Sequence, residues 1–241
     1  MNDNEFVKKL SQKYGYSLEL ENYLKTLLPA LITYYGEDKR EIIYNALLSC
    51  EIHIQEKGED SNQFLKQYFN RQKDIKVPFL AGAFYENDIQ LKDFQVVLKS
   101  IIYIRTYDSG FDFNDERKLA TLTHEICHAI KGYKKLEITP DGLINSTGLI
   151  KDYYQLDKST NEFVEVKSDN TGLEEGLNSY DEKQIMTIMM GKPFEGTTYP
   201  ILVQIIELLD RIPNLLEVIK TSQFTGNNEW IDFLGSERAQ F

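Results

Sequence analysis

The sequence predicts an α+β fold in which a helical N-terminal part is followed by a small mixed sheet and a helical C-terminal part. Three observations lead to this prediction. Apolar residues recur with helical spacing through most of residues 1–75. Short segments rich in β-branched and aromatic residues replace that spacing between residues 77 and 104. Helical spacing then returns in segments that are separated by turn-forming residues, so helices and strands occupy different parts of the chain.

Three or four helices are expected in the N-terminal part. The first covers Asp3–Tyr14, and the second covers Ser17–Tyr35, where Pro29 should kink the helix or divide it in two. A third helix is expected to start at the acidic residues after Gly36 and to continue through Ile54 to Gly58. A short fourth helix is expected at residues 61–71.

The sheet is expected to begin in the apolar segment Val77–Tyr85. Two further segments, Phe94–Leu98 and Ile101–Ile104, are rich in β-branched and aromatic residues and predict strands. Tyr107–Gly110 is a turn signal. After it, Asn114 or Asp115 can cap a helix that extends to Lys131, with Gly132 just beyond its end.

The rest of the chain alternates turn-rich and helical segments. Residues 139–169 predict one or two β-hairpins, with turn signals at residues 140–142 and 145–148, and a helix is expected from Gly172 to Gly191. Apolar periodicity at Tyr199–Leu209 and Leu215–Ile219 predicts two more helices, with Pro213 between them.

Composition limits the classes of function. The 241 residues carry 38 acidic and 27 basic side chains, a net charge of −11, and no basic tract, so neither nucleic acid nor a membrane surface is an expected partner. No apolar run is long enough to span a membrane. Two cysteines and the absence of a visible signal segment lead us to expect a cytoplasmic protein.

One motif carries chemistry. The segment His124-Glu125-Ile126-Cys127-His128 matches His-Glu-x-x-His and falls within the helix expected at Asp115–Lys131. Side chains at positions i and i+4 share one face of a helix, so both imidazoles can bind one metal ion, while Glu125 can reach a metal-bound water. Apolar flanking residues predict that this helix is buried. We interpret Cys127 as a core residue rather than a redox switch.

A catalytic zinc needs a third protein ligand. His53 is interpreted as a surface or core-edge residue, so the expected ligand is a downstream carboxylate. Thr171 and Glu174 match a capping box, which assigns Glu174 a structural role and leaves Glu175 available. Gly176 beside it allows the close approach of another helix.

These motifs resemble those of the gluzincin group of zinc metallopeptidases. The segment Glu-Gly-Leu-Asn-Ser-Tyr that begins at Glu175 is similar to the Glu-Gly-(Leu/Phe)-x-x-Tyr pattern of many bacterial gluzincin-like domains, in which the Glu is the third zinc ligand. The resemblance covers about residues 95–210. It implies a zincin-like metallopeptidase domain at residues 76–241, after the helical region 1–75, with Zn²⁺ bound by His124, His128 and Glu175.

The sequence departs from the group at one position. Some gluzincins place an acidic residue four positions after the third ligand, where it hydrogen-bonds a zinc-ligating histidine; here that position is Ser179. Asn178, Ser179 and Asp181 stay open as the residue that supports the ligands. For the donor to the oxyanion, Tyr180 and Tyr199 are candidates, and we favour Tyr199.

We therefore predict a zinc-dependent metallopeptidase that acts on a peptide or protein substrate, with Glu125 as the general base. The alternative is a non-catalytic or single-partner regulatory protein that retains a metal-binding zincin fold. A third hypothesis is a purely structural zinc, which predicts unfolding on chelation.

Overall fold

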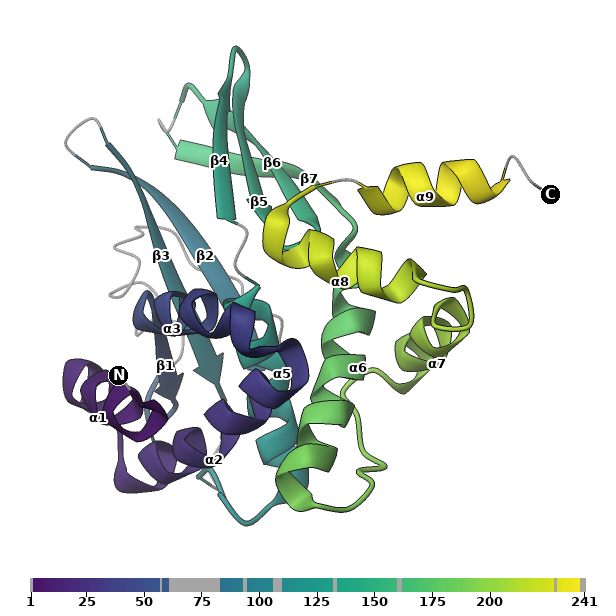
Figure 1. Cartoon of the computed structure of the whole chain (residues 1–241). Helices are drawn as coiled ribbons and strands as arrows, with labels where there is room; N and C mark the ends of the chain where they lie inside the picture. The colour runs from purple at the N-terminus through teal and green to yellow at the C-terminus, as the bar shows by residue number, and fades with distance from the viewer. Residues whose placement is uncertain are drawn as a thin grey trace. The chain divides into compact units, whose positions relative to one another are not determined.

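The computed structural model describes residues 2–56, 58–60, 83–92, 95–105, 110–131, 134–159, 162–227 and 229–238. These residues form helices and two small sheets, a mixed arrangement that agrees with the expected α+β class (Figure 1). The chain divides into two compact units. Unit 1 comprises residues 1–130 and 184–195, and unit 2 comprises residues 131–183 and 196–241. The boundary expected between residues 75 and 76 lies outside the described residues.

Unit 1 begins with the helices that the periodicity predicted. The Asn2 side chain caps the first helix, and the Ser17 hydroxyl caps the second by accepting a hydrogen bond from the N–H of Leu20 at 3.2 Å. The second helix is not divided at Pro29, because the buried leucines around it hold both halves in one packed layer. These elements are α1 (Asp3–Tyr14), α2 (Leu18–Tyr35), the 3-10 turn η1 (Glu37–Lys39) and α3 (Arg40–Leu48).

The expected continuation of the third helix to Gly58 is wrong. Helix α3 ends at Leu48, and strand β1 (Cys50–Ile54) follows. Apolar residues in β1 alternate with polar ones, and the strand pairs in parallel with β3 (Gln95–Ile104) from Cys50↔Ser100 to Ile54↔Ile104. The β-branched residues therefore satisfy their backbone in a sheet, and this pairing overrides the helical spacing that continues through the segment.

Three strands make the sheet of unit 1, in the order β1-β3-β2. Strand β2 (Ala83–Lys92) pairs antiparallel with β3, which is one continuous strand where the sequence suggested two. Of the strand expected at Val77–Tyr85, only Ala83–Tyr85 is described, and it lies in β2. The helix expected at residues 61–71 and the turn at residues 107–109 lie outside the described residues.

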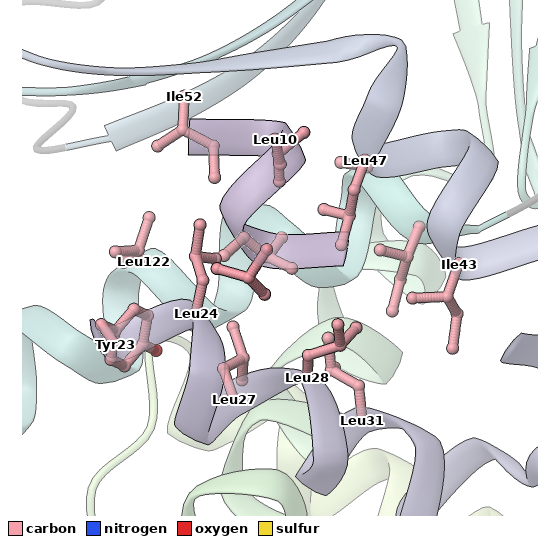
Figure 2. Close-up of a cluster of buried hydrophobic side chains, with 14 of the residues drawn as sticks. Leu10, Tyr23, Leu24, Leu27, Leu28, Leu31, Ile43, Leu47, Ile52 and Leu122 are labelled. Atoms are coloured by element: carbon pink, nitrogen blue, oxygen red, sulfur yellow. The ribbon is translucent and has the colours of Figure 1, made fainter. Parts of the chain in front are cut away.

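The core of unit 1 is built mainly from helix α2. Leu24, Leu27 and Leu31 each keep at most 2% of their surface exposed, and each such burial stabilises the fold by about 1.5–3 kcal/mol. Figure 2 shows these side chains converging with residues of α1, α3, β1 and α5 (Glu116–Ile130). Helix α5 also packs against α3, β2 and β3. The partners labelled in the figure include Leu10, Ile43, Leu47, Ile52 and Leu122.

Unit 2 contains a four-stranded antiparallel sheet in the order β4-β5-β6-β7, which extends the one or two hairpins that were expected. The turn signal at Asn145–Gly148 is only partly right, because residues 145–147 belong to a strand and the turn falls at Gly148 and Leu149. Gly148 adopts a positive φ of 58°, which glycine accepts without strain. The strands are β4 (Lys134–Thr139), β5 (Gly142–Thr147), β6 (Ile150–Asp157) and β7 (Glu162–Asp169).

The helices expected in the C-terminal part are present, and a further helix, α9, was not expected. Close packing between α6 and α7 confirms the role assigned to Gly176, where a Cβ would lie 3.2 Å from Cγ1 of Ile206. A separate apolar core, which includes Leu177, Ile206, Leu215 and Ile219, holds these helices. The elements are α6 (Thr171–Met190), α7 (Pro200–Leu209), α8 (Leu215–Thr225) and α9 (Glu229–Arg238).

None of the helices in the parts of the chain that the structure describes is both long enough and apolar enough to cross a bilayer.

Candidate metal centre

Helix α5 carries the His-Glu-x-x-His motif and starts at a well-formed cap. The Asp115 carboxylate accepts a hydrogen bond from the N–H of Arg117 at 2.9 Å and lies 3.4 Å from the N–H of Lys118. Asp115 is therefore the capping residue, whereas Asn114 contacts Asp112 instead. The helix expected at Asp115–Lys131 is confirmed to within one residue at each end.

The second half of α5 is buried on all sides. Every residue from Leu122 to Ile130 keeps less than a tenth of its surface exposed, and most of the apolar ones belong to the core of unit 1. Cys127 is fully buried in that core, which supports its interpretation as a core residue. The motif thus lies on a helix whose position is fixed by packing on several sides.

The two imidazoles of the motif point their Nε2 atoms at each other. The Nε2 atoms of His124 and His128 are 3.2 Å apart, and the two rings are nearly perpendicular, at 75°. Two imidazoles that bind one tetrahedral zinc at about 2.05 Å hold their nitrogens about 3.3 Å apart. In the structure the two nitrogens share a hydrogen bond, and their separation also matches that of two ligands of a single zinc ion.

Glu125 is buried beside this pair, with 6% of its surface exposed. One helical residue turns the side chain about 100° away from His124, so Glu125 does not share the face of the two histidines. Burial shields this carboxylate from bulk water, and its role as a general base stays a prediction.

Glu175 lies on α6 and is half-buried. Among the described residues, His124, His128 and Glu175 form a group of side chains that could hold a metal ion. Two imidazoles and one carboxylate are the donor set of many catalytic zinc sites, which keep a fourth position for water. The donor set is thus chemically compatible with zinc, and zinc binding stays a prediction.

Glu174 has a different environment from its neighbour. The predicted capping box is wrong, because Thr171 is already the first residue of α6 and its hydroxyl contacts Ser168 at 2.9 Å. The Glu174 carboxylate instead accepts hydrogen bonds from the N–H of Leu149 at 3.0 Å and from Nε2 of Gln223 at 2.9 Å. Its structural role is thus supported, with other partners than expected.

The three residues proposed to support the ligands are all fully buried on α6. Asp181 binds Nζ of Lys131 at 2.6 Å and Nζ of Lys220 at 3.1 Å, so its carboxylate is engaged by two lysines. The carbonyl of Ser179 accepts a hydrogen bond from Thr197. A contact from Asn178, Ser179 or Asp181 to a zinc-binding histidine stays a prediction.

The two candidate tyrosines lie on unit 2. Tyr199 immediately precedes α7 and exposes 44% of its surface. Tyr180 is half-buried on α6, with Nζ of Lys220 4.9 Å from the centre of its ring. Their role as donors to an oxyanion stays a prediction.

The third histidine is engaged elsewhere. His53 lies on β1, where its Nε2 is 2.8 Å from the carboxylate of Glu59 and its ring stacks on Tyr103. These contacts agree with its interpretation as a core-edge residue.

Sequence reasoning missed the partners of Asp181 and Glu174. Lys131 was expected in the last turn of a helix, but it is fully buried with Asp181, and Gln223 of α8 joins it to Glu174. Neither residue carries a local signal, since a lysine after an apolar helix and a glutamine within one are both ordinary at a surface.

Comparisons with models of protein families, with curated proteins and with solved structures found no match to this chain.

Proposed function

We propose that this protein is a zinc-dependent metallopeptidase of the gluzincin type with a zincin-like fold. The single observation that carries the proposal is the buried His-Glu-x-x-His helix, with 3.2 Å between the Nε2 atoms of His124 and His128. The grouping of Glu175 with these two histidines supports it as the third ligand.

In this proposal, His124, His128 and Glu175 hold the zinc, and a water molecule completes its coordination. When bound, Zn²⁺ supplies a Lewis acid that polarises the scissile carbonyl and lowers the pKa of the water to about 7. Glu125 would accept a proton from the attacking water molecule as the water oxygen adds to the carbonyl carbon. The same carboxyl then donates the proton to the amine nitrogen as the peptide bond breaks. Tyr199, or otherwise Tyr180, donates a hydrogen bond to the oxyanion.

Metal analysis tests the ligand set. The purified protein should contain about one zinc per chain, and His124→Ala should lose it, whereas the matched variant His53→Ala should retain it. Glu125→Gln should keep zinc and lose hydrolysis. Wild-type protein that binds no zinc at micromolar concentration would overturn the proposal.

A peptide library separates the peptidase from the alternative of a regulatory metal-binding protein. Zinc-loaded wild type should cleave some members of a broad library, and Glu125→Gln, measured in parallel, should cleave none. If both proteins leave every peptide intact, the regulatory alternative is favoured. Chelation distinguishes the structural-zinc hypothesis, which requires unfolding when zinc is removed.

A further inference from the structure

A chain of polar side chains in unit 2, most of them buried, lies along one face of the segment of α6 that carries Glu175. Oε1 of Glu174 accepts a hydrogen bond from Nε2 of Gln223 at 2.9 Å, and Oε1 of Gln223 accepts one from Nζ of Lys131 at 3.1 Å. Lys131 then binds Asp181 at 2.6 Å, and Lys220 binds the other oxygen of Asp181 at 3.1 Å. We call these five residues the α6 network.

The α6 network contacts the helix at Glu174 and Asp181, which lie before and after the proposed ligand Glu175 in the sequence. Glu174 and Asp181 are seven residues apart, so they lie on the same face within about 20° and about 10 Å apart along the axis. Glu175 is one residue beyond Glu174 and points about 100° away from this face. Fixing the face of Glu174 and Asp181 therefore fixes the direction in which the Glu175 side chain leaves the helix.

The network carries equal numbers of negative and positive charges, and most of its side chains are shielded from solvent. Glu174 and Asp181 supply two negative charges, and Lys131 and Lys220 supply two positive ones. Glu174, Asp181, Lys131 and Gln223 each expose at most 1% of their surface, while the Lys220 side chain is 23% exposed. Because four of the five side chains are desolvated, removing a charged partner from one of them is costly.

Small rotations of α6 matter for metal binding. The tip of a side chain lies about 5–6 Å from the axis of its helix, so a rotation of about 20° moves it by about 2 Å. Metal–ligand distances tolerate only about 0.2 Å. A helix that carries a ligand therefore needs a device that fixes its rotation.

We propose that the α6 network sets the rotation of α6 and thereby holds Glu175 in position as the third zinc ligand. Gln223 and Lys131 are then positioning residues that act through Glu174 and Asp181. This inference rests on the proposed function, since it assigns the network a role in the affinity of the same zinc site.

The central test changes one donor and then restores it. Gln223→Glu keeps an acceptor for Lys131 but places a second carboxylate against Glu174, so it should raise the zinc dissociation constant at least tenfold. Adding Glu174→Gln makes residue 174 the donor and the carboxylate at position 223 the acceptor, the reverse of the wild type. The net charge of the wild type is also restored. The double variant should recover wild-type affinity within about threefold. Affinity is measured with Zn²⁺ alone against a chromophoric chelator.

Ile219→Ala serves as the matched control. Ile219 is on the same helix as Gln223 and is 1% exposed, but it packs in the apolar core of unit 2 rather than in the network. The substitution destabilises α8 through a cavity, yet it should leave zinc affinity within about threefold of wild type. The ligand-field absorption of bound Co²⁺ should change in Gln223→Glu and remain as in wild type in Ile219→Ala.

The outcomes separate the inference from the proposed function. If the wild-type protein binds no zinc, both the proposed function and the positioning role are overturned. If His124→Ala abolishes binding but Gln223→Glu binds as tightly as wild type, or Ile219→Ala binds as weakly as Gln223→Glu, only the positioning role is overturned. Should Gln223→Glu not fold, Lys220→Ala at the exposed end of the network replaces it, with a smaller loss of affinity expected and an unchanged affinity contradicting the inference.

Discussion

The hydroxyl of Tyr23 on α2 shares a hydrogen bond with Oγ1 of Thr123, the residue that immediately precedes His124 on α5. The same hydroxyl lies 3.1 Å from the carbonyl of Leu119. Both side chains are buried, so the bond links the N-terminal helical layer to the motif helix in a place that water does not reach.

Tyr23→Phe should therefore destabilise the protein by about 0.5–1.5 kcal/mol, because a buried hydrogen bond is lost while the Thr123 hydroxyl keeps the carbonyl of Leu119 as an acceptor. Urea denaturation measures the change. Tyr199→Phe provides the comparison, since Tyr199 is 44% exposed and its substitution should change stability by less than about 0.5 kcal/mol. Equal stability of Tyr23→Phe and wild type would contradict the expectation.

The adjacent residues Glu174 and Glu175 should respond in different ways. Glu175→Ala should weaken zinc binding by about 100-fold or more and leave the fold largely intact, because it removes a ligand. Glu174→Ala should instead lower the free energy of unfolding by about 1–3 kcal/mol even in the absence of zinc, because Gln223 and the N–H of Leu149 lose their acceptor. Zinc titration and urea denaturation of both variants test this. The prediction would be contradicted if Glu174→Ala weakened zinc binding and Glu175→Ala lowered the free energy of unfolding.

The ion pair between Lys131 and Asp181 should be costly to break and cheaper to replace. Asp181→Ala leaves a buried ammonium and should cost about 3–5 kcal/mol. The double variant Lys131→Met with Asp181→Leu removes both charges and should recover most of that loss. Urea denaturation of the single and double variants measures the loss in the free energy of unfolding. Equal losses in the two variants would show that the unpaired buried charge does not cause the destabilisation.

Gly148 and Gly172 offer a comparison of two glycine-to-alanine substitutions. At position 148 the φ of 58° disfavours alanine, and a Cβ would lie 2.9 Å from Oε1 of Glu174, so Gly148→Ala should cost at least about 1–2 kcal/mol. Gly172 lies in the first turn of α6, with no atom within 4 Å of an added Cβ. Gly172→Ala should raise the free energy of unfolding slightly, by up to about 1 kcal/mol. A neutral result for Gly148→Ala would argue against the strained turn.

Asp152 on β6 should make stability depend on pH with a defined sign. Burial raises the pKa of its carboxyl above the ordinary value, although a hydrogen bond from Ser168 opposes the shift. A group whose pKa is higher in the folded state destabilises the fold at pH values above that pKa, and the penalty fades as pH falls through it. Asp152→Asn, which keeps an acceptor for Ser168, should therefore stabilise the protein at neutral pH, with a gain that disappears in acid.

Asp112 is the control of opposite sign. Hydrogen bonds from the backbone N–H and the side chain of Asn114 lower the pKa of its carboxyl. Asp112→Asn should thus destabilise the protein at neutral pH, and the difference should fade as pH falls through the lowered pKa. Melting temperatures measured across the acid range compare the two variants, and the same sign for both would contradict the assignment.

Local signals predicted the helices of the described chain well. Capping residues and apolar spacing located α1, α2, α5 and α6 to within one or two residues, because these signals act within one helical turn. Strand β1 was missed because its identity depends on pairing with β3, about fifty residues away in the sequence. Long-range pairing leaves no periodic trace that distinguishes a short apolar strand from the end of a helix.

The candidate site shows the same contrast between local sequence signals and long-range packing. The spacing of His124 and His128 alone predicted that their rings would share one helical face, and the structure brings their nitrogens to 3.2 Å. In contrast, the burial of Lys131 and its bond to Asp181 depend on tertiary packing, which no neighbouring residue signals. The sequence thus predicted the proposed zinc ligands and missed the buried residues that bind the neighbouring parts of α6.

The division of the chain into units has a consequence for how the protein could be shortened. Residues 184–195 return to unit 1 and supply Ile185, Met186 and Phe194 to its apolar clusters, although residues 131–183 belong to unit 2. A fragment that stops at Ile130 therefore lacks part of its own interior, and one that starts at Lys131 carries a stretch that belongs to the other unit. Because unit 1 is discontinuous in the sequence, no single cut of the chain separates the two units.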